Sequence, residues 1–275
     1  MNYRSRVLCC ISLAMAVLPS CQKVIELDLN STDPVIVIEA NVSNLPGPYS
    51  VELHKTVNFS DANIFPPCTG AAVTINDNAG NSELLTETTP GTYTTASLQG
   101  IVGRIYTISV TADGKNYQGV SNLPAPVTID TLIVSTSTGF GPGGGGMGGN
   151  DSVKSISVHF TDPIGITNYY RLVEIVNGVR VNTFSITSDL YQDGFSMEET
   201  IRGGSDFELN TGDVVTIQLQ SIDKNVYEYF RTFNETSGGG GFTSASPANP
   251  TSNISNGALG YFNAYSVTSK TIVIQ

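Results

Sequence analysis

The residues best suited to acid–base or nucleophilic chemistry are few and far apart in this chain. Its 275 residues include two histidines, His54 and His159, and four cysteines. A catalytic triad needs a histidine beside its nucleophile, and a histidine-based zinc site needs several ligands close together. The two histidines fall in different predicted domains, so we expect neither kind of site. Cys68 follows Pro66-Pro67 in a loop-like stretch and is predicted to be a small structural residue rather than a nucleophile.

The carboxylates of the chain also show no pattern typical of a metal site or an acid–base pair. Several aspartates fall in turn-like segments, namely Asp77, Asp113, Asp162 and Asp193. An EF-hand loop needs alternating oxygen ligands and a closing glutamate, which these segments lack, and turn formation accounts for most of them. The neighbours Glu198-Glu199 would point to opposite faces of a strand. We therefore expect no catalytic residue, no metal site and no cofactor. The prediction is that the protein is not an enzyme.

The segment Gly141–Gly146 matches the letters G-x-G-x-x-G of a dinucleotide-binding loop. Such a loop must open a helix, whereas Val153–Phe160 reads as a strand, so the run is predicted to be a hairpin tip. It belongs to a longer glycine-rich loop, Gly139–Asn150, and a second run follows at Gly238–Gly241. These loops are either adaptable contacts to a partner or simply mobile. They contain or adjoin three large apolar residues: Phe140, Met147 and Phe242.

Residues 1–20 have the pattern of a bacterial lipoprotein signal peptide. Arg4 and Arg6 precede an apolar stretch, Val7–Leu18, that is too short to span a membrane. The stretch ends in Leu18-Pro19-Ser20-Cys21, which reads as a lipobox and predicts lipid attachment at Cys21. Several acyl chains would make a durable membrane anchor. Cys9 and Cys10 would leave with the leader, so no intramolecular disulfide is expected.

Charge excludes one class of function. Acidic residues number 24 and basic residues 13, a formal net charge of -11. Loss of the leader would remove two arginines and no acid. An acidic chain without a basic stripe repels phosphate backbones, so no nucleic-acid partner is expected. An apolar content of 40% also argues against wholesale disorder.

The pattern along the chain is mainly that of short strands with turn residues between them. Alternating or β-branched runs predict strands, and they are most regular at Arg104–Thr111, Tyr169–Val176 and Val214–Gln220. Apolar residues at helical spacing predict one amphipathic helix over Ser221–Phe233, capped by Asp223 or Ser221. Final strands are expected within Gly260–Gln275. The fold class predicted is mainly β, with antiparallel sheets and one short helix.

Two prolines in Leu123-Pro124-Ala125-Pro126 favour a semi-rigid linker. The sequence therefore predicts a β-sandwich domain over residues 21–125 and a second β-rich domain, with the glycine-rich loops and the helix, over residues 126–275.

Six segments of the chain form a recognisable set. The most specific is Asn249–Ile254 continuing through Gly257–Phe262. The others are Cys21–Leu29, Gly70–Ile75, Pro90–Tyr93, Asp162-Pro163 with Asn168–Leu172, and Ser221–Asp223 with Tyr227–Phe230. Together they resemble a family of unknown function among Bacteroidetes outer-membrane lipoproteins, often encoded beside TonB-dependent receptors. The resemblance implies an immunoglobulin-like first domain and brings no catalytic residues. The glycine runs look expanded relative to the family.

The functional expectation follows from the leader and the resemblance together. The leading hypothesis is a non-enzymatic outer-membrane lipoprotein that serves as an accessory or binding subunit of a TonB-dependent transporter or related envelope complex. The alternative is a stand-alone adhesion or scaffold lipoprotein, and an unrecognised hydrolase ranks below both. Which side of the outer membrane it faces stays open, because the first acid after Cys21 is Glu26 rather than an immediate acidic cluster.

Overall fold

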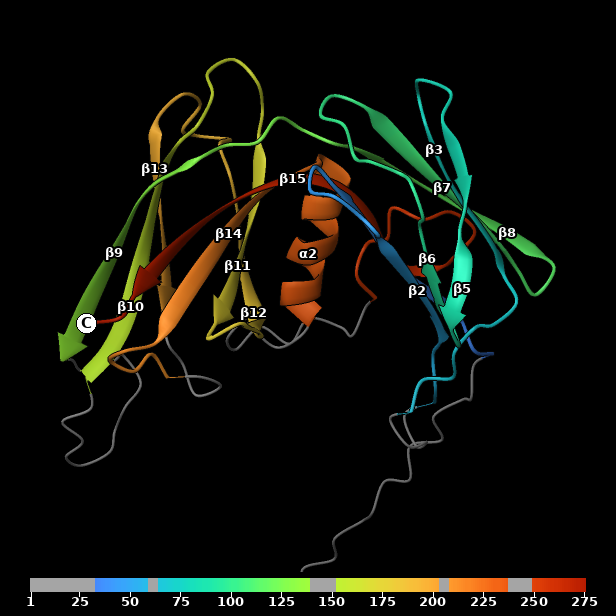
Figure 1. The fold of residues 1–275 in the computed structure, drawn as a ribbon, viewed down its shortest axis with the longest axis horizontal. Helices are drawn as coiled ribbons and strands as arrows, with labels where there is room; N and C mark the ends of the chain where they lie inside the picture. The colour runs from blue at the N-terminus through green and yellow to red at the C-terminus, as the bar shows by residue number, and fades with distance from the viewer. Residues whose placement is uncertain (1–32, 59–63, 139–151, 203–207, 237–248) are drawn as a thin grey trace, which may run out of the picture. The chain divides into compact units, whose positions relative to one another are not determined.

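The computed structural model describes residues 33–58, 64–138, 152–202, 208–236 and 249–275, and residues from Pro34 to Gln275 form one compact unit. Within these ranges the chain forms fifteen strands and one helix, which confirms the predicted mainly β fold class (Figure 1). The described part contains no helix long and apolar enough to cross a membrane.

The first sandwich is built from the strands that precede the proline-rich segment. A four-stranded sheet in the order β4-β3-β7-β8 packs on strands β1, β2, β6 and β5 of a larger sheet. The bounds are β1 Ile36–Ser43, β2 Ser50–Lys55, β3 Ala72–Asp77, β4 Ser82–Leu84, β5 Thr86–Thr89, β6 Thr92–Thr94, β7 Ile105–Ala112 and β8 Lys115–Asn122.

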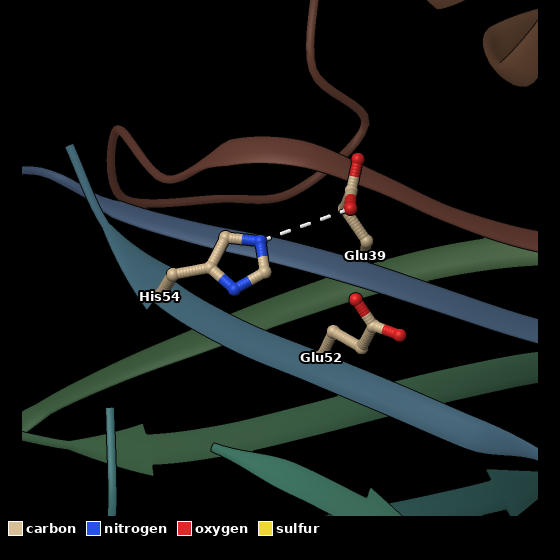
Figure 2. Close-up of side chains that lie close together, drawn as sticks. All are labelled: Glu39, Glu52 and His54. Atoms are coloured by element: carbon tan, nitrogen blue, oxygen red, sulfur yellow. Dashed lines mark ion pairs between the residues drawn. The ribbon is translucent and has the colours of Figure 1, made fainter. Parts of the chain in front are cut away.

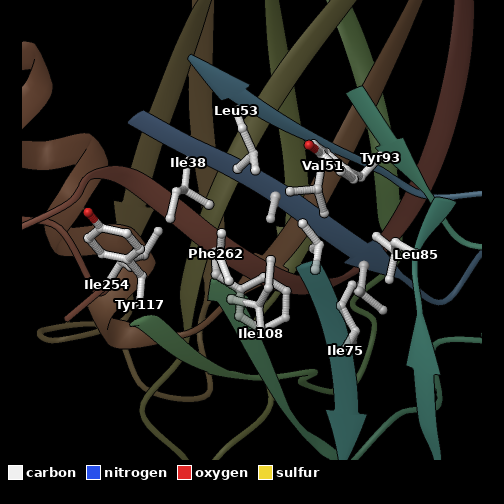
Figure 3. Close-up of a cluster of buried hydrophobic side chains, with 14 of the residues drawn as sticks. Ile38, Val51, Leu53, Ile75, Leu85, Tyr93, Ile108, Tyr117, Ile254 and Phe262 are labelled. Carbon is white, nitrogen blue, oxygen red and sulfur yellow. The ribbon is translucent and has the colours of Figure 1, made fainter. Parts of the chain in front are cut away.

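Alternation along these strands produces the first core. In β1 the buried positions are Ile36, Ile38, Ala40 and Val42, while the residues between them are only half-buried. Figure 3 shows Ile38, Val51 and Leu53 meeting Ile75 and Ile108 between the two sheets. The predicted hairpin loop at Asp77–Asn81 joins β3 to β4, where the Asp77 carboxylate accepts hydrogen bonds from the backbone N–H groups of Ala79 and Asn81.

The second sandwich packs the sheet β13-β10-β9 on strands β11, β14 and the end of β15, around a separate apolar core, and β12 lies beside β11 at the edge of the larger sheet. The bounds are β9 Ile129–Thr138, β10 Ser152–Thr161, β11 Tyr169–Val176, β12 Val179–Ser188, β13 Ser196–Arg202, β14 Val214–Ile222 and β15 Leu259–Val273. Strand β10 follows the glycine run where a dinucleotide site would need a helix. Strand β13 was not predicted, because its sequence, SMEETIR, has one apolar residue near each end.

Helix α2, Lys224–Thr236, is the predicted amphipathic helix displaced by three residues. The displacement arises because β14 continues to Ile222, and Asp223 then accepts hydrogen bonds from the backbone N–H groups of Asn225 and Val226 as the N-cap. The buried side chains of α2, Val226, Tyr229 and Phe230, pack on the face of the sheet opposite the second core.

Strand β15 belongs to both sandwiches. Residues Leu259–Tyr265 pair in parallel with β1, and Ser266–Val273 pair antiparallel with β14 (Figure 1). The final strands expected within Gly260–Gln275 are therefore one strand of 15 residues. The predicted division between 21–125 and 126–275 falls between β8 and β9 and stays a prediction. The structure adds that Ile254, Ala258, Phe262 and Ala264, from the later part of the chain, lie in the first core.

Candidate functional site

The residues expected to anchor the protein or contact a partner lie outside the part of the chain that the structure describes. These are Cys21 with the leader, both glycine-rich loops, and Phe140, Met147 and Phe242. Lipid attachment at Cys21 and the role of the loops therefore stay predictions.

His54 lies on the outer face of the first sandwich beside two glutamates (Figure 2). Antiparallel pairing of β1 with β2 places Glu39 opposite Glu52, and His54 Nε2 lies 3.8 Å from Glu39 Oε2. One side-chain ligand atom from each residue lies within 4.8 Å of the others. The sequence alone did not predict this group, because only the register of β1 with β2 brings the two carboxylates close to His54. All three side chains are partly or fully open to solvent, and an ion pair on a sheet surface is a sufficient description.

His159 and Cys68, the other residues considered for acid–base or nucleophilic chemistry, lie in different sandwiches. His159 lies opposite Glu198 on β10 and β13, with Nε2 4.0 Å from Oε1. Cys68 is buried in the first core, and its backbone N–H donates to the carbonyl of Leu53. Burial raises the pKa of the Cys68 thiol, which reduces its thiolate fraction at neutral pH.

Asn249–Phe262 is the most specific part of the family resemblance. From residue 253 onward, this segment forms hydrogen bonds that connect strands of the first sandwich. The Asn253 amide accepts from the backbone N–H of Phe262 at 2.9 Å and donates to its carbonyl at 2.7 Å, as a neighbouring strand would. Ser255 exchanges hydrogen bonds with the backbone of Gln118 on β8, and Ile254 enters the first core. This segment therefore ties β15 to β8 and offers no reactive group.

Arg171 is a buried cation beneath helix α2. Its guanidinium carbon lies 4.0 Å from the ring centre of Phe230 and 4.8 Å from that of Phe184, and its Nε has no hydrogen-bond partner. Burial lowers the pKa of Arg171 to about 10, so the side chain stays protonated at neutral pH. Stacking on two rings compensates part of the desolvation and fixes α2 on the sheet.

Two loops of the second sandwich lie side by side and both carry exposed apolar side chains. They are the β10–β11 loop, residues 162–168, and the β12–β13 loop, residues 189–195. Backbone groups of both loops bond across to the other: Asp162 N–H to Phe195 O at 3.0 Å, Asp189 N–H to Asn168 O at 3.2 Å. A Cβ on Gly194, whose φ is +76°, would lie 2.9 Å from Ile164 Cβ, so this close approach requires glycine.

These loops expose five large apolar side chains, which we call the apolar tip. Their exposed fractions run from 59% to 95%, and the residues are Ile164, Ile166, Leu190, Tyr191 and Phe195. Large apolar patches are uncommon on monomeric proteins and mark sites of contact with a partner, so apolar side chains gathered on two adjoining loops make a candidate contact surface. The apolar tip was not predicted from the sequence, because the aspartates in these segments indicated only turns.

Three aspartates lie in the same loops. Asp162 and Asp189 are buried and Asp193 is exposed, and one carboxylate oxygen from each lies within 4.8 Å of the others. We call Asp162, Asp189 and Asp193 the acidic cluster. Asp162 and Asp193, predicted as turn residues, do bond to turn backbone, accepting from Gly194 N–H at 3.0 Å and Gly165 N–H at 2.7 Å.

Fold and surface together define a protein of two β-sandwiches joined by a shared strand, with an apolar, acidic loop surface at one of them. The chain belongs to the family described as Domain of unknown function (DUF4249), whose model matches residues 22–271. This confirms the expected membership of a family of unknown function.

No curated protein matches the chain. Among solved structures, the adhesin InvE of Yersinia pseudotuberculosis is similar at 18% identity, over 68% of this chain and 55% of the adhesin chain, with a TM-score of 0.21. The chain thus spans about half the length of that adhesin.

Proposed function

We propose that this protein is a non-enzymatic outer-membrane lipoprotein that acts as an accessory or binding subunit of a TonB-dependent transporter or related envelope complex. The observation that carries the proposal is the apolar tip. Its five side chains lie on two loops whose backbones are hydrogen-bonded to each other, so binding a partner there would not require the loop backbones to become ordered.

The membrane part of the proposal is supported by the leader. A charged start, a short apolar stretch and Ser20-Cys21 at its end are what lipoprotein processing requires. Acyl chains on Cys21 would keep the protein at the membrane surface, where a β-barrel partner is at high effective concentration. The absence of an enzymatic activity stays a prediction.

The experiment is a mild-detergent pull-down of the tagged chain at native expression, read by mass spectrometry. We expect a stoichiometric β-barrel partner with the wild type and its loss with the double variant Leu190→Ser/Tyr191→Ser. A matched control, Leu84→Ser/Val179→Ser, removes two exposed apolar side chains elsewhere and should retain the partner. Cys21→Ala should leave the membrane fraction.

Two results would contradict the proposal. Recovery of the intact protein alone would favour a stand-alone adhesion or scaffold lipoprotein. Equal recovery of the partner with both double variants would show that the apolar tip is not the contact.

A further inference from the structure

The acidic cluster has the geometry of a cation site assembled from two loops. Its members are 27 and 4 residues apart along the chain and meet because the loops bond to each other. Two oxygens on opposite sides of a Ca²⁺ ion, each about 2.4 Å away, are separated by about 4.8 Å. The oxygens of the three carboxylates all lie within 4.8 Å of one another, so their separations meet this limit for sharing a single ion.

Asp189 supplies the observation that a merely turn-forming cluster would not. The residue is 2% exposed, its Oδ2 accepts from the backbone N–H of Asn168 at 2.8 Å, and its Oδ1 is buried without any hydrogen-bond partner. A buried carboxylate oxygen left unpaired is costly. A ligated cation would satisfy it.

The charges around Asp189 also favour a bound cation. Asp162 and Asp193 are its charged neighbours, and the ion pairs found among the described residues include none of the three aspartates. Asp162 is also held by Tyr170, whose buried hydroxyl donates to Oδ1, and by Gly194 N–H. Each carboxylate oxygen keeps a lone pair for a metal.

We propose that Asp162, Asp189 and Asp193 bind one Ca²⁺ ion, which locks the β10–β11 loop to the β12–β13 loop beneath the apolar tip. Ca²⁺ fits because the side-chain donors are all carboxylate oxygens, and an ion that takes six to eight oxygen ligands can complete its coordination with water or backbone carbonyls. Mg²⁺ demands shorter bonds and near-ideal octahedral order. The site was not expected from the sequence, and it does not depend on the proposed function.

The test uses the detergent-purified full chain after removal of metal with EDTA. Added CaCl₂ at about 1 mM, the range of extracellular Ca²⁺ modules, should raise the melting temperature, and Tb³⁺ should give tyrosine-sensitised luminescence that Ca²⁺ competes away. Asp193→Asn is the main variant, because Asp193 is exposed and its loss need not disturb folding. It should weaken Ca²⁺ binding by at least about tenfold. Asp189→Asn should abolish binding.

The matched control is Glu39→Gln/Glu52→Gln, which removes the other group of carboxylates and should leave the Ca²⁺ response unchanged. The proposal is overturned if the wild type shows no Ca²⁺-dependent shift, or if Asp193→Asn responds as the wild type does. An equal response to Mg²⁺ at the same concentration would overturn the assignment to Ca²⁺. Repeating the pull-down in EDTA separates the two proposals. Partner binding without Ca²⁺ would show that the contact does not need the metal, while the Ca²⁺ response of the purified chain still tests the metal site by itself.

Discussion

Glu174 is a carboxyl group whose environment differs sharply from water. It lies on β11, the residue is 3% exposed, and its Oε1 has no hydrogen-bond partner. Burial raises the pKa of this carboxyl from 4.5 to about 7. The folded chain therefore holds the proton to higher pH than the unfolded chain does, and the free energy of unfolding falls as the pH rises from 4.5 through 7.

We expect Glu174→Gln to remove this pH dependence. Above pH 7 the variant should be more stable than the wild type by about 1–3 kcal/mol, because no buried charge remains. Urea unfolding between about pH 5 and about pH 8 measures it. Glu208→Gln, at an exposed glutamate, is the control and should follow the wild-type curve. Identical slopes for Glu174→Gln and wild type would show that Glu174 does not titrate in this range.

At the scale of elements, one carboxylate joins helix α2 to the first sandwich. Asp223 Oδ1 caps α2, while its Oδ2 accepts from the Ser121 hydroxyl and from Asn122 N–H, at 3.2 Å, on β8. Ser121 Oγ in turn accepts from the backbone N–H of Ala264 on β15 at 2.9 Å. The start of α2, β8 and β15 are thus held by a buried network in which each bond orients the next.

Asp223→Ala should lower the free energy of unfolding by about 2–4 kcal/mol, since it removes a cap and leaves buried donors unpaired. Asp223→Asn keeps one oxygen for the cap and should lose less. A double-mutant cycle with Ser121→Ala, measured by urea unfolding, isolates the link between the elements. Additive losses in that cycle would mean that the two side chains act independently.

At the scale of the whole molecule, the shared strand β15 is expected to couple the two sandwiches. Its pairing with β1 depends on Gly260, whose φ is +88° and where a Cβ would lie 2.1 Å from the Ile38 carbonyl oxygen. No side chain fits there without moving β1, so the backbone approach itself requires glycine.

Gly260→Ala should cost about 3 kcal/mol or more and lower amide-exchange protection in both sandwiches, β10 and β14 included. Hydrogen exchange read by mass spectrometry measures this strand by strand. Gly114→Ala, at φ +73° with nothing within 4 Å, is the control and should cost only about 1 kcal/mol. Loss of protection confined to β1–β8 would show that the second sandwich folds without β15 paired to β1.

Local pattern accounts for what the sequence determined by itself. Alternation located strands such as β11 at Tyr169–Val176, helical spacing located α2, and turn residues located the β3–β4 hairpin. These features are decided by side-chain period and backbone preference, which neighbouring residues express without the rest of the chain.

Tertiary structure alone decided which distant residues meet. A single strand, β15, pairs with β1 in its first half and with β14 in its second half, and this change of partner was not predicted from the sequence. The acidic cluster joins Asp162 to Asp189 and Asp193, and the register of β1 with β2 brings Glu39 to His54. Such encounters depend on loop closure and on burial shared by the whole fold, so they are absent from any local window of sequence.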